Sequence, residues 1–302
     1  MRLMALLILF FAMHSFASTQ STPDTDFCAN SAATIDDQIA ACTRAITSGS
    51  LPTPVLSATF FDRGDAWRSK GDNDRAIADY SDAIRLNPQY ARAFASRCGV
   101  WLIKGDNDRA VADCSEAIRL DPQNAKFVHN RGMVWRRKGD YDRAIADYNE
   151  AIRLNPQDAN TFNGRGVAWK FKGDYDRAIA DYNEAIRLNP QGSSAFYNRA
   201  GAWYDKGDDD RAIADYNEAI RLNPQDGKAF HGRGDAWKAK GDNDRANADY
   251  TEAMRLDSHA NDRRGASVRR GAGAAEETGS RRLRNLALNS SLKYELGLRL
   301  CS

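Results

Sequence analysis

The sequence repeats itself with a period of 34 residues. A glycine followed by an aspartate recurs six times at this spacing, from Gly71 to Gly241. The six tryptophans keep the same period, each four residues before its glycine: Trp67, Trp101, Trp135, Trp169, Trp203 and Trp237. Periods of about 20–50 residues are typical of repeat proteins, in which each unit packs against the next. The period therefore favours an elongated array over one globular core.

Each unit contains the pattern of two helices. We number the positions of a repeat from 1, so that repeats 1 to 6 start at Ser57, Ala91, Ala125, Ala159, Ser193 and Gly227. In repeat 4, apolar residues between Ala178 and Leu188 recur at steps of three and four, as on one face of an amphipathic helix. Gly173 suits the end of the preceding helix. Asp174 suits the start of the helix that contains Ala178 to Leu188, and Pro190 suits its end. The sequence thus predicts an all-α fold built from helix pairs.

This pattern resembles the tetratricopeptide repeat (TPR) family. The residues of repeat 4 that match the family motif, at positions 8, 11, 17, 20, 24, 27 and 32, are Gly166, Trp169, Tyr175, Ala178, Tyr182, Ala185 and Pro190. The same register fits six repeats over residues 57–259, with local departures such as Cys98 at position 8 and Val128 at position 4. The resemblance implies an all-α superhelical solenoid of six helix-turn-helix repeats.

Both ends of the array carry boundary features. Residues 36–48 align with the second helix of a repeat, so residues 18–56 are expected to hold a degenerate N-terminal half-repeat whose first helix is not evident. Position 21 is apolar in repeats 1 to 5 but is Asn247 in repeat 6, as expected of a last unit with no neighbour to bury it. The repeats are therefore expected to end near His259.

Residues 260–302 differ in composition from the repeats. They form a basic low-complexity tail, rich in Gly, Ala, Arg and Glu over residues 261–280 and in Leu over residues 281–300. The leucine-rich part is interpreted first as a displaced terminal helix that caps the array. The alternatives are a basic helix on an anionic membrane surface and a poorly structured tail.

Residues 1–17 have the organisation of a secretory signal peptide. Arg2 gives the positive start, residues 3–13 are apolar, and Ser15 and Ala17 are the small residues of a cleavage site. The apolar run is short for a membrane span, although an uncleaved anchor stays open as the alternative. We therefore expect an exported protein. The resemblance to exported TPR proteins implies a periplasmic or secreted location in a Gram-negative bacterium.

In an oxidising compartment the cysteines are candidates for disulfides. Cys98 and Cys114 stand at positions 8 and 24 of repeat 2, which face each other across one helix hairpin. Cys28 and Cys42 are 14 residues apart in a similar arrangement. Both pairs are disulfide candidates, with two small buried thiols as the alternative for Cys98 and Cys114. Cys301 is left over.

The sequence carries no pattern of a catalytic or cofactor site. Its four histidines include one within residues 1–17, and His129 and His231 stand three repeats apart, too far to bind one metal ion together. No glycine-rich phosphate loop is present, and the Gly-Asp-Asn-Asp turns lack the ligand spacing of a calcium loop. We therefore expect no enzyme activity, no cofactor and no metal. The net charge of +2 argues against nucleic acid as the main ligand.

Charged residues also follow the period. Position 7 is arginine and position 23 is aspartate in all six repeats, from Arg63 and Asp79 to Arg233 and Asp249. Matched series of this kind predict ion pairs within or between neighbouring hairpins, which is a structural role. The tryptophan series likewise predicts packing between hairpins.

The repeats differ mainly in their first helices. The resemblance to TPR proteins implies that positions 2, 5, 6, 9, 12 and 13 of these helices line a concave groove. The candidate partner-binding residues at these positions are Arg92, Lys126, His129, Asn130, Arg136, Asn160, Asn163, Lys170, Tyr197, Asn198 and Tyr204. Cations and amides on a rigid surface suit an acidic or C-terminal peptide, with an ordinary solvated groove as the alternative.

One known TPR activity is not expected. The two-carboxylate clamp of chaperone-binding TPR proteins needs lysine at position 5 and asparagine at position 9, and no repeat has either. The sequence favours a non-catalytic protein–protein interaction scaffold that binds a peptide or partner segment, of acidic character, in the concave groove. Two other functions stay open: an adaptor for a periplasmic hydrolase, and a structural array that self-assembles through its near-identical repeats.

Overall fold

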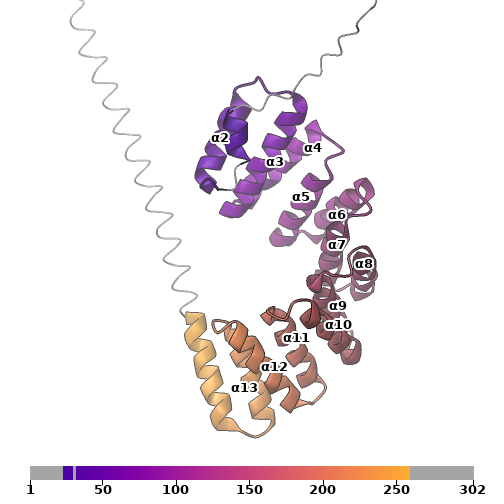
Figure 1. Ribbon diagram of the computed structural model, residues 1–302, viewed down its shortest axis with the longest axis vertical. Helices are drawn as coiled ribbons and strands as arrows, with labels where there is room; N and C mark the ends of the chain where they lie inside the picture. Colours follow the sequence, from indigo (N-terminus) through magenta and orange to yellow (C-terminus); the bar gives the residue numbers. More distant parts are fainter. Residues whose placement is uncertain (1–22, 30–31, 259–302) are drawn as a thin grey trace, which may run out of the picture. The chain divides into compact units, whose positions relative to one another are not determined.

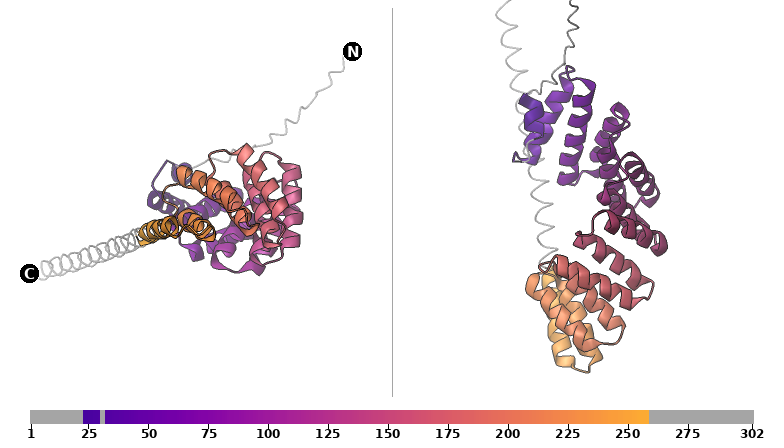
Figure 2. Two further views of the ribbon diagram at one scale, coloured as in Figure 1. Left: turned by 90° about the horizontal axis from the view of Figure 1, so that it is seen from below. Right: turned by 45° about the vertical axis from the view of Figure 1, so that its right-hand side comes forward.

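The structure, a computed structural model, describes residues 23–29 and 32–258. Every regular element in these two ranges is a helix, and successive helices lie side by side within each unit (Figure 1, Figure 2). This confirms the all-α solenoid of helix-turn-helix repeats. The described helices belong to two compact units, which divide between Lys172 and Gly173.

First and second helices alternate along both units. Unit 1 holds the N-terminal helix pair, repeats 1 to 3 and the first helix of repeat 4: α1 (Pro23–Cys28), α2 (Ile35–Thr47), α3 (Thr53–Lys70), α4 (Asn73–Leu86), α5 (Ala91–Lys104), α6 (Asn107–Leu120), α7 (Ala125–Arg137), α8 (Tyr141–Leu154) and α9 (Ala159–Phe171). Unit 2 continues with α10 (Tyr175–Leu188), α11 (Ser193–Asp205), α12 (Asp209–Leu222), α13 (Gly227–Ala239) and a last helix over residues 243–258.

The recurring Gly-Asp pair builds the turn between the two helices of a repeat. In repeat 1, Gly71 ends α3 with φ of 87°, a left-handed conformation that glycine adopts without strain. The Asp72 side chain then caps α4 by accepting a hydrogen bond from the backbone N–H of Arg75. Equivalent caps are made by Asp106, Asp140, Asp174 and Asp208. The Gly-Asp pair that recurs every 34 residues therefore ends the first helix of each repeat and starts the second.

A buried tyrosine at position 24 fills the space between the helices of a repeat. Tyr80 and Tyr148 are fully buried, and their rings lie against Gly64 and Gly132 at position 8. A Cβ atom on Gly64 would lie 2.8 Å from Cε1 of Tyr80, closer than two carbon atoms pack. The absence of a side chain at Gly64 therefore makes room for the ring of Tyr80, whereas repeat 5 has Ala200 at position 8 in the same core cluster as Tyr216.

Both expected cysteine pairs are bonded in the structure. Cys98 and Cys114 are joined with their Cα atoms 5.4 Å apart, and so replace the glycine–tyrosine contact in repeat 2. Cys28 and Cys42 are joined with their Cα atoms 4.8 Å apart. All four sulfur-bearing residues are buried. Cys301 lies outside the described residues.

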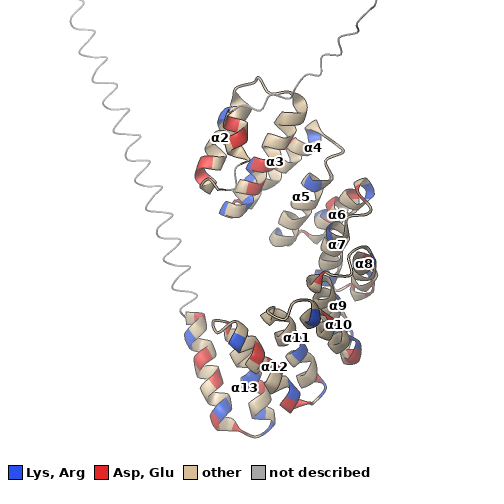
Figure 3. Ribbon diagram, in the orientation of Figure 1, with Lys and Arg blue, Asp and Glu red and all other residues tan. Residues whose placement is uncertain are grey.

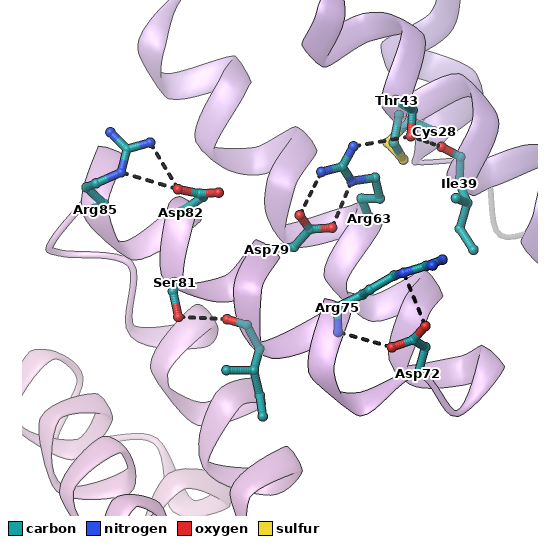
Figure 4. A network of polar contacts seen from close by, with 12 residues as sticks. Cys28, Ile39, Thr43, Arg63, Asp72, Arg75, Asp79, Ser81, Asp82 and Arg85 are labelled. Atoms are coloured by element: carbon teal, nitrogen blue, oxygen red, sulfur yellow. Dashed lines mark hydrogen bonds and ion pairs between the residues drawn. A yellow bond between two sulfur atoms is a disulfide. The ribbon is translucent and has the colours of Figure 1, made fainter.

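The arginine at position 7 joins each repeat to the one before it. Arg63 makes a bidentate ion pair with Asp79 of its own repeat, at 2.8 and 2.7 Å, and its third nitrogen donates to Oγ1 of Thr43 on α2 (Figure 4). The later arginines donate to the residue at position 25 of the preceding repeat, in the pairs Arg97–Ser81, Arg131–Ser115, Arg165–Asn149, Arg199–Asn183 and Arg233–Asn217. The predicted ion pairs thus also fix the register between repeats.

A second contact joins the lysine at position 14 to an aspartate at position 18 of the preceding unit. The pairs are Lys70–Asp36, Lys104–Asp74, Lys138–Asp108, Lys172–Asp142, Lys206–Asp176 and Lys240–Asp210. Because the aspartates are largely exposed, each pair contributes little stability. Positive and negative residues are consequently interspersed along the helices of both units (Figure 3).

The N-terminal segment forms more of a repeat than the sequence indicated. The first helix of the half-repeat, not evident from the sequence, is the six-residue α1. It is too short to show an amphipathic pattern, and the bond from Cys28 to Cys42 holds it on α2. Helix α3 begins at Thr53, ahead of position 1 of repeat 1, because Pro52 and Pro54 favour the first turn of a helix.

The last helix, residues 243–258, has the open face expected of a terminal unit. Asn247 is exposed, whereas Ile145 and Ile213 at the same position are 6% exposed. The neighbouring Met254 is 66% exposed. Within the described ranges, no helix is both long and apolar enough to cross a membrane. The proposed signal peptide and the tail of residues 260–302 lie outside those ranges.

Candidate functional site

Successive first helices of unit 1 lie closer together than successive second helices. Contacts join α3 to α5, α5 to α7 and α7 to α9, whereas the second helices that the structure describes in this unit make none with the next second helix. The first helices therefore line the inner side of this unit, as the resemblance implied.

A hollow of about 630 Å³ opens on this inner side, between α3, α5 and α7. Its apolar lining consists of Phe61, Ala95, Cys98, Gly99, Leu102, Phe127 and Met133. Its polar lining consists of Asp65, Arg68, Arg92, Ser96, Lys126 and Asn130. Three cationic side chains thus surround an apolar floor that carries a single carboxylate.

The cations are held at the edge of the hollow. The Arg92 guanidinium lies over the ring of Phe61, 4.9 Å from its centroid, and Arg68 pairs with Asp65 at 3.3 Å. Arg92 and Lys126 stand at position 2 of their repeats, near the start of α5 and α7, and both are exposed. Their charged ends are therefore available to a ligand that lies on the apolar floor.

Asp62 adds a second acidic group at the α3 end of this region. Burial, with a further contribution from the nearby Asp65, raises the pKa of Asp62 to about 6, and Arg92 acts in the opposite direction. Near neutral pH this carboxyl is held in its less favoured charged form. An acidic ligand is consequently repelled at this end and attracted by Arg92 and Lys126.

The structure brings three of the predicted binding residues together, namely Arg92, Lys126 and Asn130. His129 does not line the hollow, and its Nδ1 lies 2.9 Å from Oγ1 of Thr161 on α9. Burial lowers the pKa of His129, so its neutral form predominates at neutral pH. This histidine contributes no positive charge to the hollow.

The other predicted residues lie outside the hollow. Arg136 is on α7, and its Nε atom is buried. Three more are on α9 of unit 1, namely Asn160, Asn163 and Lys170. The remaining three are on α11 of unit 2, namely Tyr197, Asn198 and Tyr204. Tyr197 packs edge-on against Tyr216, with ring centroids 5.8 Å apart.

Most residues that line the hollow were not among the predicted binding residues, and two of them, Arg68 and Met133, bear on the binding of a ligand. Arg68 stands at position 12 of repeat 1, and the same position supplied the prediction for Arg136, so a search of repeat 1 would have found it. Met133 stands at position 9, which is also one of the expected groove positions, but its apolar side chain does not distinguish it from a core residue.

The lining of the hollow suits binding. It contains no histidine and a single carboxylate, so it lacks a pair of groups for acid–base chemistry. Among the residues that the structure describes, no group of three His, Cys, Asp or Glu side chains could hold a metal ion. Stacked helix pairs with a hollow on their inner side are the architecture of a helical-repeat binding protein.

Comparison with known families identifies which class of helical repeat this is. A sequence profile described as "Tetratricopeptide repeat" matches residues 61–125 and 171–227, and one described as "TPR repeat" matches residues 134–170. The chain belongs to the tetratricopeptide repeat family. Proteins of this family generally mediate protein–protein interactions. A comparison with curated proteins gives no match.

Solved structures show the same fold. A tetratricopeptide repeat protein from Parabacteroides merdae is 19% identical, with a TM-score of 0.63 over 74% of this chain and 86% of that chain. PilW, a type IV pilus biogenesis factor, is 18% identical, with a TM-score of 0.61 over 64% and 90% of the two chains. PilF of Pseudomonas aeruginosa is 20% identical, with a TM-score of 0.58 over 66% and 91%. At these identities the likeness concerns the fold alone.

Proposed function

We propose that the chain is a non-catalytic scaffold that binds an acidic segment of a partner protein in the hollow of unit 1. The observation that supports this most directly is the set of three cations, Arg68, Arg92 and Lys126, around an apolar floor. Acidic side chains of a bound segment pair with these cations, while its apolar side chains cover Phe127 and Leu102. Interaction along an extended segment then gives affinity through many modest contacts on a preorganised surface.

We propose further that this scaffold works outside the cytoplasm, in the periplasm or as a secreted protein. The signal-like residues 1–17 support export. Two cysteine pairs at bonding distance suit an oxidising compartment. Expression with residues 1–17 present, followed by fractionation and N-terminal sequencing, tests this: a protein retained in the cytoplasm with Met1 intact would contradict export.

Binding is tested with defined peptides on residues 18–302. Fluorescence anisotropy would compare a blocked peptide of alternating Glu and Leu with its Gln–Leu and Lys–Leu counterparts. We expect the Glu–Leu peptide to bind most tightly and its affinity to fall with added salt. Equal affinity for all three peptides would contradict an acidic partner.

Matched charge variants locate the site. The double variant Arg92→Ala and Lys126→Ala should weaken Glu–Leu binding by about tenfold or more, since two charge-assisted contacts are lost. The control double variant Arg85→Ala and Arg119→Ala removes the same charge from exposed side chains on α4 and α6. Equal weakening by both doubles would indicate a diffuse charge effect and no binding in the hollow.

The alternative functions give different results in the same preparation. An adaptor for a periplasmic hydrolase would copurify with an enzyme from periplasmic extract and would bind it in preference to free peptides. A self-assembling array would show light scattering that rises with protein concentration, in the absence of any peptide.

A further inference from the structure

Repeats 1 and 6 each contain a carboxylate that accepts a hydrogen bond from the buried tyrosine at position 24. In repeat 1, Tyr80 donates to Asp65 at 2.6 Å, and Asp65 also pairs with Arg68 at 3.3 Å. In repeat 6, Tyr250 donates to Asp235 at 2.8 Å. In both repeats the aspartate stands at position 9 of the first helix.

Repeat 6 adds a histidine to the same arrangement. Nδ1 of His231 at position 5 lies 3.3 Å from Asp235, and its ring centroid lies 5.2 Å from that of Tyr250. The aspartate at position 9 is therefore surrounded by the side chains of positions 5, 12 or 24, depending on the repeat. In these two repeats, the side chains around position 9 thus form a carboxylate-binding site that the repeat's own aspartate occupies.

Repeat 3 retains the surrounding groups but lacks the carboxylate. It has His129 at position 5, Arg136 at position 12 and Tyr148 at position 24, whereas position 9 is Met133. The rings of His129 and Tyr148 have centroids 5.5 Å apart, close to the spacing in repeat 6. The donors of both filled sites are thus present together in repeat 3, without their acceptor.

Two of these donors have no acceptor for their hydrogens. The Tyr148 hydroxyl and Nε of Arg136 are both buried and donate to no other group, and the Tyr148 side chain as a whole is fully buried. Burial raises the pKa of Tyr148, and the charge and hydrogen-bonding contact of the adjacent Arg136 guanidinium partly offset that rise. Leaving buried donors unpaired costs about 1–3 kcal/mol each, so the arrangement is favourable only if something else pairs with them.

One side chain of the hollow also reaches the core around Tyr148. Met133 lines that hollow and also packs against the core cluster that contains Tyr148. A methionine side chain is unbranched and flexible, so it can move aside more readily than a branched residue. Displacement of Met133 would connect the hollow to Tyr148 and Arg136.

We propose that repeat 3 is a carboxylate subsite, in which an acidic group of the bound partner accepts hydrogen bonds from Tyr148 and Arg136. The partner's carboxylate takes the place that Asp65 and Asp235 occupy in repeats 1 and 6. This inference rests on the proposed function, since it names the anchor point for an acidic segment lying in the hollow.

Filling the subsite from within the chain tests the proposal. Met133→Asp recreates the sequence of the filled repeats, and we expect it to weaken binding of the Glu–Leu peptide by about tenfold or more. Met133→Leu is the matched control, which keeps position 9 apolar and should leave binding within about twofold of the parent. The subsite would be overturned if the Met133→Asp variant and the parent had equal affinity both for this peptide and for one with a free C-terminal carboxylate.

Removing one donor gives a second measurement that a purely structural role would not produce. Tyr148→Phe should weaken binding of the Glu–Leu peptide by about fivefold to tenfold and raise the urea midpoint, because it removes a buried hydroxyl that has no acceptor in the free protein. Tyr80→Phe should lower the urea midpoint, because that hydroxyl is bonded to Asp65. A loss of stability in Tyr148→Phe with no loss of binding would contradict the proposal.

The carboxylate could come from a side chain or from a chain terminus, and two peptides distinguish them. One is the Glu–Leu peptide with an amidated C-terminus, and the other is the Gln–Leu peptide with a free C-terminal carboxylate. Whichever peptide loses affinity in Met133→Asp identifies the source. Loss of affinity for neither would overturn the subsite.

The subsite can also be judged if no peptide binds. N-acetylglutamate, titrated while the Arg136 Nε–H resonance is followed by NMR, should shift that resonance in the parent and not in Met133→Asp. Such a shift without peptide binding would support the subsite and reject the proposed function. Peptide binding that depends on Arg92 and Lys126 but is unaffected by Met133→Asp would support the proposed function and reject the subsite. The absence of both the shift and peptide binding would reject both.

Discussion

Gly64 and Tyr80 are in van der Waals contact across the helix pair of repeat 1. A Cβ atom added to Gly64 would lie 2.8 Å from Cε1 of the tyrosine ring and 2.9 Å from Cδ1. The ring cannot easily move away, because its hydroxyl is bonded to Asp65 and its side chain is fully buried. The two positions therefore act as one packing unit, which recurs at Gly132 and Tyr148.

This contact predicts opposite effects for two glycine substitutions. Gly64→Ala should lower the free energy of unfolding by about 1–3 kcal/mol, because overpacking outweighs the gain in helix propensity. Gly99→Ala places its Cβ where no atom lies within 4 Å, so it should raise stability by about 0.5–1 kcal/mol. Urea unfolding followed by circular dichroism measures both. Shifts of the same sign would show that the contact is unimportant.

The arginine that links repeats predicts a large loss on truncation. Arg97→Ala leaves Asp113, which is 6% exposed, without its bidentate partner and removes the hydrogen bond to Ser81. We expect a loss of about 3 kcal/mol in the free energy of unfolding. Arg119→Ala breaks an exposed pair with Glu116 and should cost less than about 1 kcal/mol. Comparable losses in the two variants would contradict a role for Arg97 in repeat stacking.

The disulfide of repeat 2 predicts a sequence swap that replaces it. Cys98→Ala with Cys114→Ala should lower the free energy of unfolding by about 2–4 kcal/mol under oxidising conditions. Cys98→Gly with Cys114→Tyr introduces the pair found at these positions in repeat 1, and should recover much of that loss. Recovery should be independent of reductant, which calorimetry with and without dithiothreitol would show. If the Gly–Tyr double variant is no more stable than the Ala–Ala double variant, the Gly–Tyr contact cannot replace the disulfide in repeat 2.

The raised pKa of Asp62 predicts a pH-dependent gain on substitution. Since the pKa of Asp62 rises from 3.8 to about 6 on folding, the folded state favours the protonated carboxyl, and stability is lost as pH increases through this interval. Asp62→Asn should therefore raise the free energy of unfolding at about pH 7.5, by about 1–2 kcal/mol after allowing for partial solvent screening. The gain should disappear by about pH 4. Urea midpoints of both proteins across this range test it, and a pH-independent difference would exclude titration of Asp62 as the cause.

Thiol counting checks the two disulfides together. The sequence has five cysteines, and the structure bonds Cys28 to Cys42 and Cys98 to Cys114. Protein unfolded without reductant should therefore react with one equivalent of a thiol reagent, and reduced protein with five. Five reactive thiols without reductant would contradict both bonds.

The sequence alone determined the helix pairs and their register, and it indicated the candidate disulfide partners. These follow from local chemistry that repeats with the period: Gly71 and Asp72 stop one helix and start the next, and every later turn has the same pair. Once the period sets the register, the periodicity of the α-helix decides which positions share a face. Cys98 and Cys114 could be paired for that reason.

The tertiary structure decided which of the groove positions act together. His129 and Asn130 are adjacent in sequence, yet Asn130 lines the hollow while His129 bonds to Thr161 on the next first helix. That the Tyr148 hydroxyl and Nε of Arg136 have no acceptor can be seen only from the positions of the atoms around them. Sequence periodicity places a side chain on a face, but its partner depends on the residues that neighbouring helices bring to that face, and these lie far away along the chain.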